Sequence, residues 1–201
     1  VHSLVITEIC ALSGKEDYSA MDDAQKIEWL SSLSTAVILD ESVTAITKDT
    51  IDSVKAVKHI QEQNGKPGSD RYIISQCNSA VDMLEVFALF VLGGWKRDAI
   101  SVDIIPLFET IGDLKNAADV MQVLYTFPLY RDHLKRRGNR QTVMLGFSDG
   151  TKDGGYLMAN FSIFKAKQEL SAISAKYGID VVFFDGRGGP PARGGGNTNK
   201  F

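Results

Sequence analysis

Two arginines in a glycine-dense segment near the C-terminus are the residues best suited to bind an anion. The segment FFDGRGGPPARGGG runs from Phe183 to Gly196 and contains Arg187 and Arg193. Glycine lets main-chain N–H groups approach a ligand closely, and each guanidinium group is a permanent planar cation that suits phosphate or carboxylate. The same composition occurs in flexible linkers and in arginine-glycine boxes that bind RNA. The strand-like run VVFF, which leads directly into the segment, favours the anion site.

Charged residues also follow the other apolar runs of the chain. Glu109 comes after VDIIPLF, Asp149 and Lys152 come after VMLGFS, and Asp185 comes after VVFF. Hard divalent cations prefer carboxylate oxygens and fill their remaining positions with water or substrate oxygens, so Glu109 and Asp149 are predicted ligands of Mg²⁺ or Mn²⁺. Taken singly, each carboxylate also suits the first turn of a helix, and Lys152 also suits an exposed helix position.

Four apolar, β-branched runs position these residues. They begin roughly 30 to 40 residues apart and are separated by helical patterns. The four predicted strands cover residues 71–76, 102–107, 141–147 and 180–184. Alternating strands and helices imply parallel pairing, in an open doubly wound sheet or in a (β/α)₈ barrel. In both architectures the functional residues gather where the strands end.

Local signals predict where the intervening helices begin. Ser79 with Asp82, and Thr110 with Asp113, have the spacing of a capping box. Pro128 suits the first turn of a short helix at residue 129. A further long helix carries an apolar stripe, which we interpret as core packing. Its members are Tyr156, Ala159, Ile163, Ala166, Leu170, Ile173 and Tyr177.

The first 70 residues have a different character. Residues 24–33 and 49–64 read as helices, and the second of them is stopped by Gly65. We therefore predict a helical segment over residues 1–70 and an α/β region over residues 71–201. The α/β region ends in the glycine-rich segment 186–196, which we expect to be mobile.

Composition restricts the class of protein. With 201 residues, 44% hydrophobic and 23% charged, the chain is expected to be globular. A net charge of −3 argues against a general nucleic-acid binder. Cys10 and Cys77 lie in apolar surroundings and are predicted to be reduced core residues of a cytoplasmic protein. No signal peptide or membrane span is predicted, because the most hydrophobic stretch, residues 83–92, is short and contains Glu85.

Three segments together resemble the phosphoenolpyruvate carboxylase family. They are PLFETIGDLKNAADVM, MLGFSDGTKDGGYLMANFSIFKAKQEL and FFDGRGGPPARGGG, in this order and spacing. The resemblance covers residues 71–201, whereas residues 1–70 fit by position and helical character. It implies a partial (β/α)₈ barrel of about four parallel β-α units, preceded by the helical segment.

The resemblance also implies a reaction and a set of roles. Phosphoenolpyruvate would be joined to bicarbonate, giving oxaloacetate and phosphate, in a cytoplasmic homotetramer without nucleic-acid or membrane partners. Glu109 and Asp149 would bind Mg²⁺ or Mn²⁺, Lys152 would hold bicarbonate, and Arg187 would contact the phosphate. Arg193, in the glycine loop with Gly188 and Gly189, would close over the substrates.

The chain departs from the family pattern at Asp185 and at Asn199, the latter standing where a histidine is commonly found. Many family members carry histidine directly before the GRGG segment, and this chain has Asp185 there. The histidine's possible role as a proton donor is therefore not expected of Asp185. Asp185 is instead expected to orient an arginine or to bind a water molecule coordinated to the metal ion. Because further site elements of the family are absent from these 201 residues, we expect the chain alone to be inactive.

Two other functions fit parts of the pattern. A different metal-dependent phosphoenolpyruvate or pyruvate barrel enzyme would share the acidic strand ends without needing the arginine-glycine loop. A phosphate-binding or RNA-binding module would be built around the glycine-rich segment.

Overall fold

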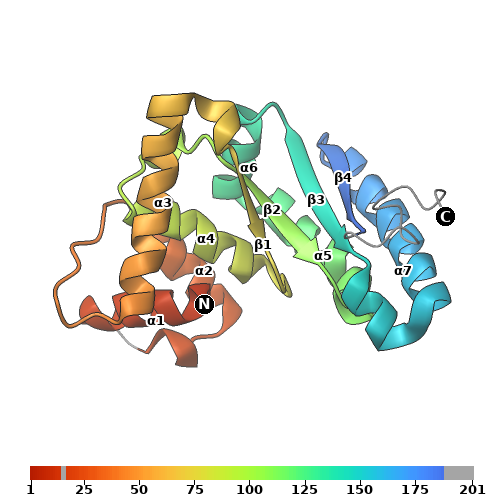
Figure 1. The fold of residues 1–201 in the computed structure, drawn as a ribbon, viewed down its shortest axis with the longest axis horizontal. Helices are drawn as coiled ribbons and strands as arrows, with labels where there is room; N and C mark the ends of the chain where they lie inside the picture. Colours follow the sequence, from red (N-terminus) through yellow and green to blue (C-terminus); the bar gives the residue numbers. More distant parts are fainter. Residues whose placement is uncertain (15–16, 188–201) are drawn as a thin grey trace, which may run out of the picture. The chain divides into compact units, whose positions relative to one another are not determined.

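The computed structural model describes residues 1–14 and 17–187 of the chain (Figure 1). These residues form two compact units. Unit 1 comprises Val1–Tyr72 and Val81–Ile104, and unit 2 comprises Ile73–Ala80 and the chain from Ile105 onward. The boundary at residue 70, drawn from the sequence, stays a prediction about domains.

Unit 1 is mainly helical. Its helices are α1 (His2–Leu12), α2 (Asp23–Ser32), α3 (Ala45–Asn64) and nearly all of α4 (Ala80–Leu92), and its 3₁₀ turns are η1 (Tyr18–Ala20), η2 (Lys66–Gly68) and η3 (Arg97–Ala99). The predictions of α2 and α3 are confirmed, although α3 begins four residues earlier than expected.

Helix α1 was not predicted, because its sequence lacks start signals. No side chain caps its N-terminus and its first turn holds no acidic residue. The helix instead packs an apolar face into the core through four buried residues, which are Val5, Ile6, Ile9 and Cys10. Tertiary burial therefore replaces the local signals that usually mark a helix start.

Helix α4 is apolar and is buried over most of its surface, and it carries one buried carboxyl group. Residues 83–92 are almost completely shielded from solvent, including Glu85. Ser3 Oγ donates a hydrogen bond of 2.7 Å to Glu85, and the Tyr18 hydroxyl donates one of 3.0 Å. Burial raises the pKa of Glu85 above its ordinary value, and it raises the pKa of Tyr18 as well.

A four-stranded sheet runs through the chain in the order β1-β2-β3-β4 (Figure 1). The strands are β1 (Arg71–Ile74), β2 (Asp103–Phe108), β3 (Arg140–Gly146) and β4 (Asp180–Gly186). Parallel pairing is confirmed for β2 with β3 and for β3 with β4. The α/β class and the four predicted strands are therefore confirmed, whereas closure into a (β/α)₈ barrel stays a prediction.

Two helices of unit 2 begin where local chemistry predicts. Helix α5 (Ile111–Thr126) has the capping box of Thr110 and Asp113, and α6 (Pro128–Arg136) starts at Pro128. Helix α7 (Ser148–Lys176) packs against α5.

A kink divides α7 near its start. Gly155 has φ +78°, a left-handed conformation that glycine adopts without steric cost. The predicted apolar stripe is buried only beyond the kink, at Ala159, Ile163, Ala166 and Leu170. Tyr156 directly follows the kink and is 66% exposed, so its assignment to the core was wrong.

The edge strands of the sheet expose apolar side chains. Ile73 on β1 and Val182 and Phe184 on β4 are all exposed. Among the described residues, both cysteines are buried thiols that form no disulfide bond, as predicted, and no helix is long and apolar enough to cross a bilayer.

The buried carboxyl of Glu85 predicts a pH-dependent stability. The folded state holds this proton more tightly than the unfolded state, so protonated Glu85 stabilises the fold, and this contribution is lost as the pH rises through the folded-state pKa. Thermal unfolding followed by circular dichroism between about pH 5 and about pH 8 should show a smaller loss of stability with rising pH in Glu85→Gln than in the unchanged protein.

The comparison must be made between variants, because other carboxyl groups act in the opposite direction. Hydrogen bonds from Thr47 and Thr44 lower the pKa of Glu8, for example. Exposed Glu41→Gln serves as the matched control and should retain the pH profile of the unchanged protein. Identical pH profiles for Glu85→Gln and Glu41→Gln would contradict the assignment.

Candidate functional site

A polar cavity of about 280 Å³ lies at the carboxyl ends of the strands in unit 2. It is lined by Gln76, Asn78, Glu109, Thr110, Asp113 and Asp149. Glu109 directly follows β2, and Asp149 lies in the first turn of α7, the helix that follows β3. The two carboxylates that the sequence placed on neighbouring strand ends therefore line one cavity.

Main-chain donors fix the position of Glu109. Its Oε2 accepts a hydrogen bond of 3.0 Å from the N–H of Gln76, and its own N–H donates to Asp113 Oδ2 at 3.1 Å. Gln76 has φ +52°, which is rare for a residue with a side chain. Backbone strain of this kind persists only where surrounding contacts hold it. Here the N–H of the strained residue, Gln76, donates to Glu109, the predicted metal ligand.

Two glycines let the Glu109 loop approach the end of β3 closely. A Cβ atom on Gly146 would lie 3.2 Å from both Cα and Cγ of Glu109, and one on Gly150 would lie 3.2 Å from the carbonyl oxygen of Glu109. Sequence reasoning did not single out these glycines. A glycine at a strand end is, however, a known sign of close backbone approach.

Asp149 already has a cationic neighbour. Lys152 Nζ forms an ion pair of 2.8 Å with Asp149 Oδ1, one turn away on α7, and the Lys152 side chain is 77% exposed. Exposed pairs of this kind contribute little to stability. Lys152 can therefore exchange this partner for an anion without a large cost to the fold.

The second acidic residue of the SDGTKD segment has a structural role. Asp153 Oδ2 accepts a hydrogen bond of 3.3 Å from the N–H of Ile111, the first residue of α5. This bond links α7 to the start of α5, next to Glu109.

Arg187 lies at the end of β4, over an aromatic ring. Its Cζ is 4.9 Å from the ring centroid of Phe147, which comes two residues before Asp149. The main chains meet here as well, since the Phe147 N–H donates to the carbonyl oxygen of Gly186 at 3.4 Å. Stacking on Phe147 thus fixes one predicted anion-binding group beside the β3–α7 turn.

Asp185 lies between two cations. Lys167 Nζ is 2.7 Å from its Oδ1, and a terminal nitrogen of Arg187 is 3.5 Å from its Oδ2. The sequence prediction that Asp185 orients an arginine is compatible with this arrangement, and Lys167 is a residue that sequence reasoning missed. The predicted binding residues Gly188, Gly189 and Arg193 lie outside the described residues, as does most of the segment 186–196.

The donor set of the cavity fits a hard divalent cation. Glu109 and Asp149 supply two carboxylates, whereas Asp113 is occupied in the capping box of α5. Within residues 1–14 and 17–187, no three histidine, cysteine, aspartate or glutamate side chains form a group able to hold a metal ion. Two carboxylates with water or substrate oxygens suit Mg²⁺ or Mn²⁺ rather than zinc.

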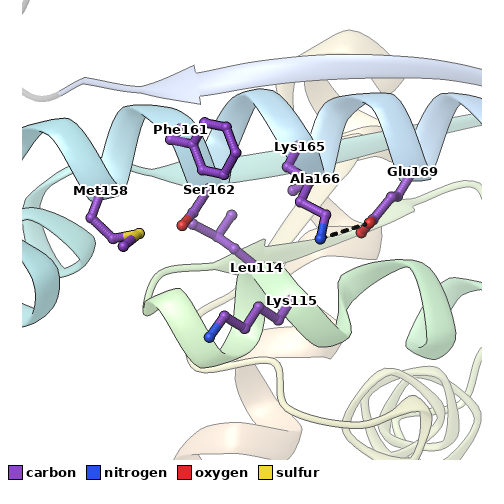
Figure 2. Close-up of a pocket in the computed structure, with 8 residues that line it drawn as sticks. All are labelled: Leu114, Lys115, Met158, Phe161, Ser162, Lys165, Ala166 and Glu169. Carbon is purple, nitrogen blue, oxygen red and sulfur yellow. Dashed lines mark ion pairs between the residues drawn. The ribbon is translucent and has the colours of Figure 1, made fainter.

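A second cavity, of about 230 Å³, lies between α5 and α7 and has a different lining (Figure 2). Leu114, Met158 and Phe161 give it an apolar wall. Its one carboxylate, on Glu169, pairs with Lys165 at 3.6 Å. The polar cavity at the strand ends is therefore the better candidate for chemistry.

Comparison with known proteins gives one consistent result. A family model described as phosphoenolpyruvate carboxylase matches residues 1–200. The phosphoenolpyruvate carboxylase of Gloeobacter violaceus is 36% identical over 89% of this chain and 20% of its own length. That of Mycobacterium leprae is 37% identical over 98% of the chain and 22% of its own length. That of Rhodothermus marinus is 34% identical over 100% of the chain and 23% of its own length. The chain thus spans about a fifth of the length of these relatives.

The close approach at Gly146 yields a prediction on stability. Gly146→Ala should lower the free energy of unfolding by about 1–3 kcal/mol, because the added methyl group crowds the backbone and side chain of Glu109. Urea unfolding measures the change.

Gly112→Ala is the matched control in the same region. A Cβ atom there meets only an ordinary contact of 3.6 Å with Thr110 Oγ1. This variant should be unchanged or more stable by about 0.5–1 kcal/mol, since alanine favours the helix. Equal free energies of unfolding for the two variants would contradict the prediction, because they would show that the Glu109 loop moves aside at no cost.

Proposed function

Because the chain belongs to the phosphoenolpyruvate carboxylase family, we propose that it is part of an enzyme that carboxylates phosphoenolpyruvate with bicarbonate and releases oxaloacetate and phosphate. The observation that carries the proposal is the shared cavity of Glu109 and Asp149, in a chain that a single family model matches over residues 1–200. We further propose that the whole enzyme is a cytoplasmic homotetramer that binds neither nucleic acid nor membranes.

Glu109 and Asp149 would hold Mg²⁺ or Mn²⁺. When bound, the ion stabilises negative charge that develops on substrate oxygens. The Gln76 N–H and the packing against Gly146 keep the Glu109 carboxylate in place before any ligand arrives. Such preorganisation avoids a reorganisation cost during the reaction.

Arg187 and Lys152 would bind the two anionic substrates. Arg187 is stacked on Phe147 and would contact the phosphate of phosphoenolpyruvate, because a guanidinium group matches phosphate oxygens geometrically. Lys152 would leave Asp149 and hold bicarbonate. Arg193 would close over both substrates, and its position lies outside the described residues.

The reaction would proceed in three steps. A bicarbonate oxygen attacks phosphorus, and the bond between phosphorus and the enol oxygen breaks, giving carboxyphosphate and the enolate of pyruvate. Carboxyphosphate then releases phosphate and carbon dioxide, and the enolate carbon attacks the carbon dioxide to form oxaloacetate. Arg187 would balance charge on the phosphoryl oxygens during the first step. Exclusion of water protects the enolate from protonation to pyruvate.

The metal assignment predicts the behaviour of two variants. In the intact enzyme, Glu109→Gln and Asp149→Asn should each weaken Mn²⁺ binding and lower kcat/KM for carboxylation by at least about 100-fold. The Glu109→Gln side chain retains an oxygen that can accept the Gln76 N–H, so a loss would report on charge. Calorimetry with Mn²⁺ and bicarbonate fixation measure the two effects.

Asp119→Asn provides the control, because Asp119 is an exposed carboxylate on α5 outside the cavity. It should leave both quantities within about twofold of the unchanged enzyme. Full Mn²⁺ affinity in both cavity variants would exclude the proposed metal ligands.

The short span of the chain relative to its family predicts that residues 1–201 alone are inactive. Because they cover about a fifth of the relatives' length, the substrates would lack most of their surrounding groups. A radiolabelled bicarbonate assay of the 201-residue chain with phosphoenolpyruvate and Mg²⁺ should give no turnover above the background. Turnover comparable with that of the intact enzyme would overturn this expectation.

A further inference from the structure

Lys167 contacts two consecutive same-face residues of β4. Its Nζ is 5.6 Å from the ring centroid of Phe183 and 2.7 Å from Oδ1 of Asp185. Alternate residues of a strand lie on one face, so α7 covers this face of β4 with a cation at its carboxyl end. The side chains of Lys167 and Asp185 are only 32% and 25% exposed.

A partly buried carboxylate in this position needs a partner. Removing a carboxylate from water is costly unless opposite charge compensates it. Two cations are within reach of Asp185, and the distances differ, since Lys167 lies at 2.7 Å and Arg187 at 3.5 Å. The closer and more shielded cation is Lys167, whereas the Arg187 side chain is 52% exposed.

The three charges add up to one spare cation. Asp185 with Arg187 alone would be neutral, and the carboxylate would compete with any anion for the guanidinium group. With Lys167 included, the cluster carries one net positive charge. The exposed member, Arg187, holds that charge at the end of β4, over Phe147.

We propose that Lys167 is a positioning residue that neutralises Asp185 and thereby keeps Arg187 available for an anionic substrate group, an inference that rests on the proposed role of Arg187 in binding phosphoenolpyruvate. Lys167 itself does not touch substrate. It acts by occupying the carboxylate that would otherwise draw Arg187 into a closed ion pair.

The test is a set of variants of the intact enzyme, assayed for the KM of each substrate. Lys167→Met keeps the length of the side chain and removes its charge. It should raise KM for phosphoenolpyruvate about tenfold and change KM for bicarbonate less than about twofold. Lys167→Arg keeps the charge and should stay within about threefold of the unchanged enzyme.

The decisive variant is the double substitution Lys167→Met with Asp185→Asn. Removing the carboxylate restores the spare cation, so KM for phosphoenolpyruvate should return to within about threefold of the unchanged value. A lysine that only supported folding would not be rescued in this way. Failure of the rescue, or an unchanged KM in Lys167→Met, would overturn the inference.

Two further variants separate this inference from the proposed function. Lys165→Met removes a cation of the same helix that pairs with Glu169 instead of Asp185, and it should leave both KM values within about twofold. Arg187→Ala should raise KM for phosphoenolpyruvate whether or not Lys167 has a positioning role, because the variant removes the proposed substrate contact itself. An effect of Arg187→Ala without an effect of Lys167→Met would refute the positioning role alone. No effect of Arg187→Ala would refute the proposed substrate contact itself.

Discussion

The candidate site depends on the close approach between the loop after β2 and the end of β3. Glu109 fits there because Gly146, at the end of β3, and Gly150, in the first turn of α7, have no side chains. Parallel register brings the two strand ends to one level, with Phe108 opposite Leu145. If this approach were wider, Glu109 and Asp149 would no longer line one cavity. The position of Glu109 thus depends on glycine at residues 146 and 150.

Hydrogen bonds from main-chain N–H groups also hold the loop after β2 in place. Asp113 satisfies main-chain donors of Glu109 and Thr110, and Asp153 satisfies that of Ile111, so three successive N–H groups at the start of α5 have carboxylate acceptors. The Glu109 side chain is left to the Gln76 N–H and the cavity. Asp113 and Asp153 thereby shape the loop, whereas Glu109 and Asp149 line the cavity.

The basic residues at the end of β4, which are not among those that line the polar cavity, are held in a different way. Arg187 stacks on Phe147 and forms a long ion pair, of 3.5 Å, with Asp185. Asp185 forms a shorter ion pair, of 2.7 Å, with Lys167. Each partner limits the motion of the next one, while the guanidinium group stays half exposed. Charge compensation within the cluster, rather than the number of arginines, then sets how strongly it can attract an anion.

Local sequence determined those features that depend on neighbouring residues. The capping box of Thr110 and Asp113, the start of α6 at Pro128 and the four strands follow from hydrogen-bonding groups and patterns that act over a few positions. The order of the acidic residues after the strands also sufficed to predict that Glu109 and Asp149 would line one cavity, because parallel strands end on one edge. Tertiary structure decided the rest. Helix α1 forms because its apolar face is buried, and Tyr156 leaves the core because Gly155 bends α7. The strained Gln76 and the Lys167–Asp185 pair join residues far apart in sequence. Such contacts depend on how the folded elements pack, and the spacing of residues along the chain does not determine that packing.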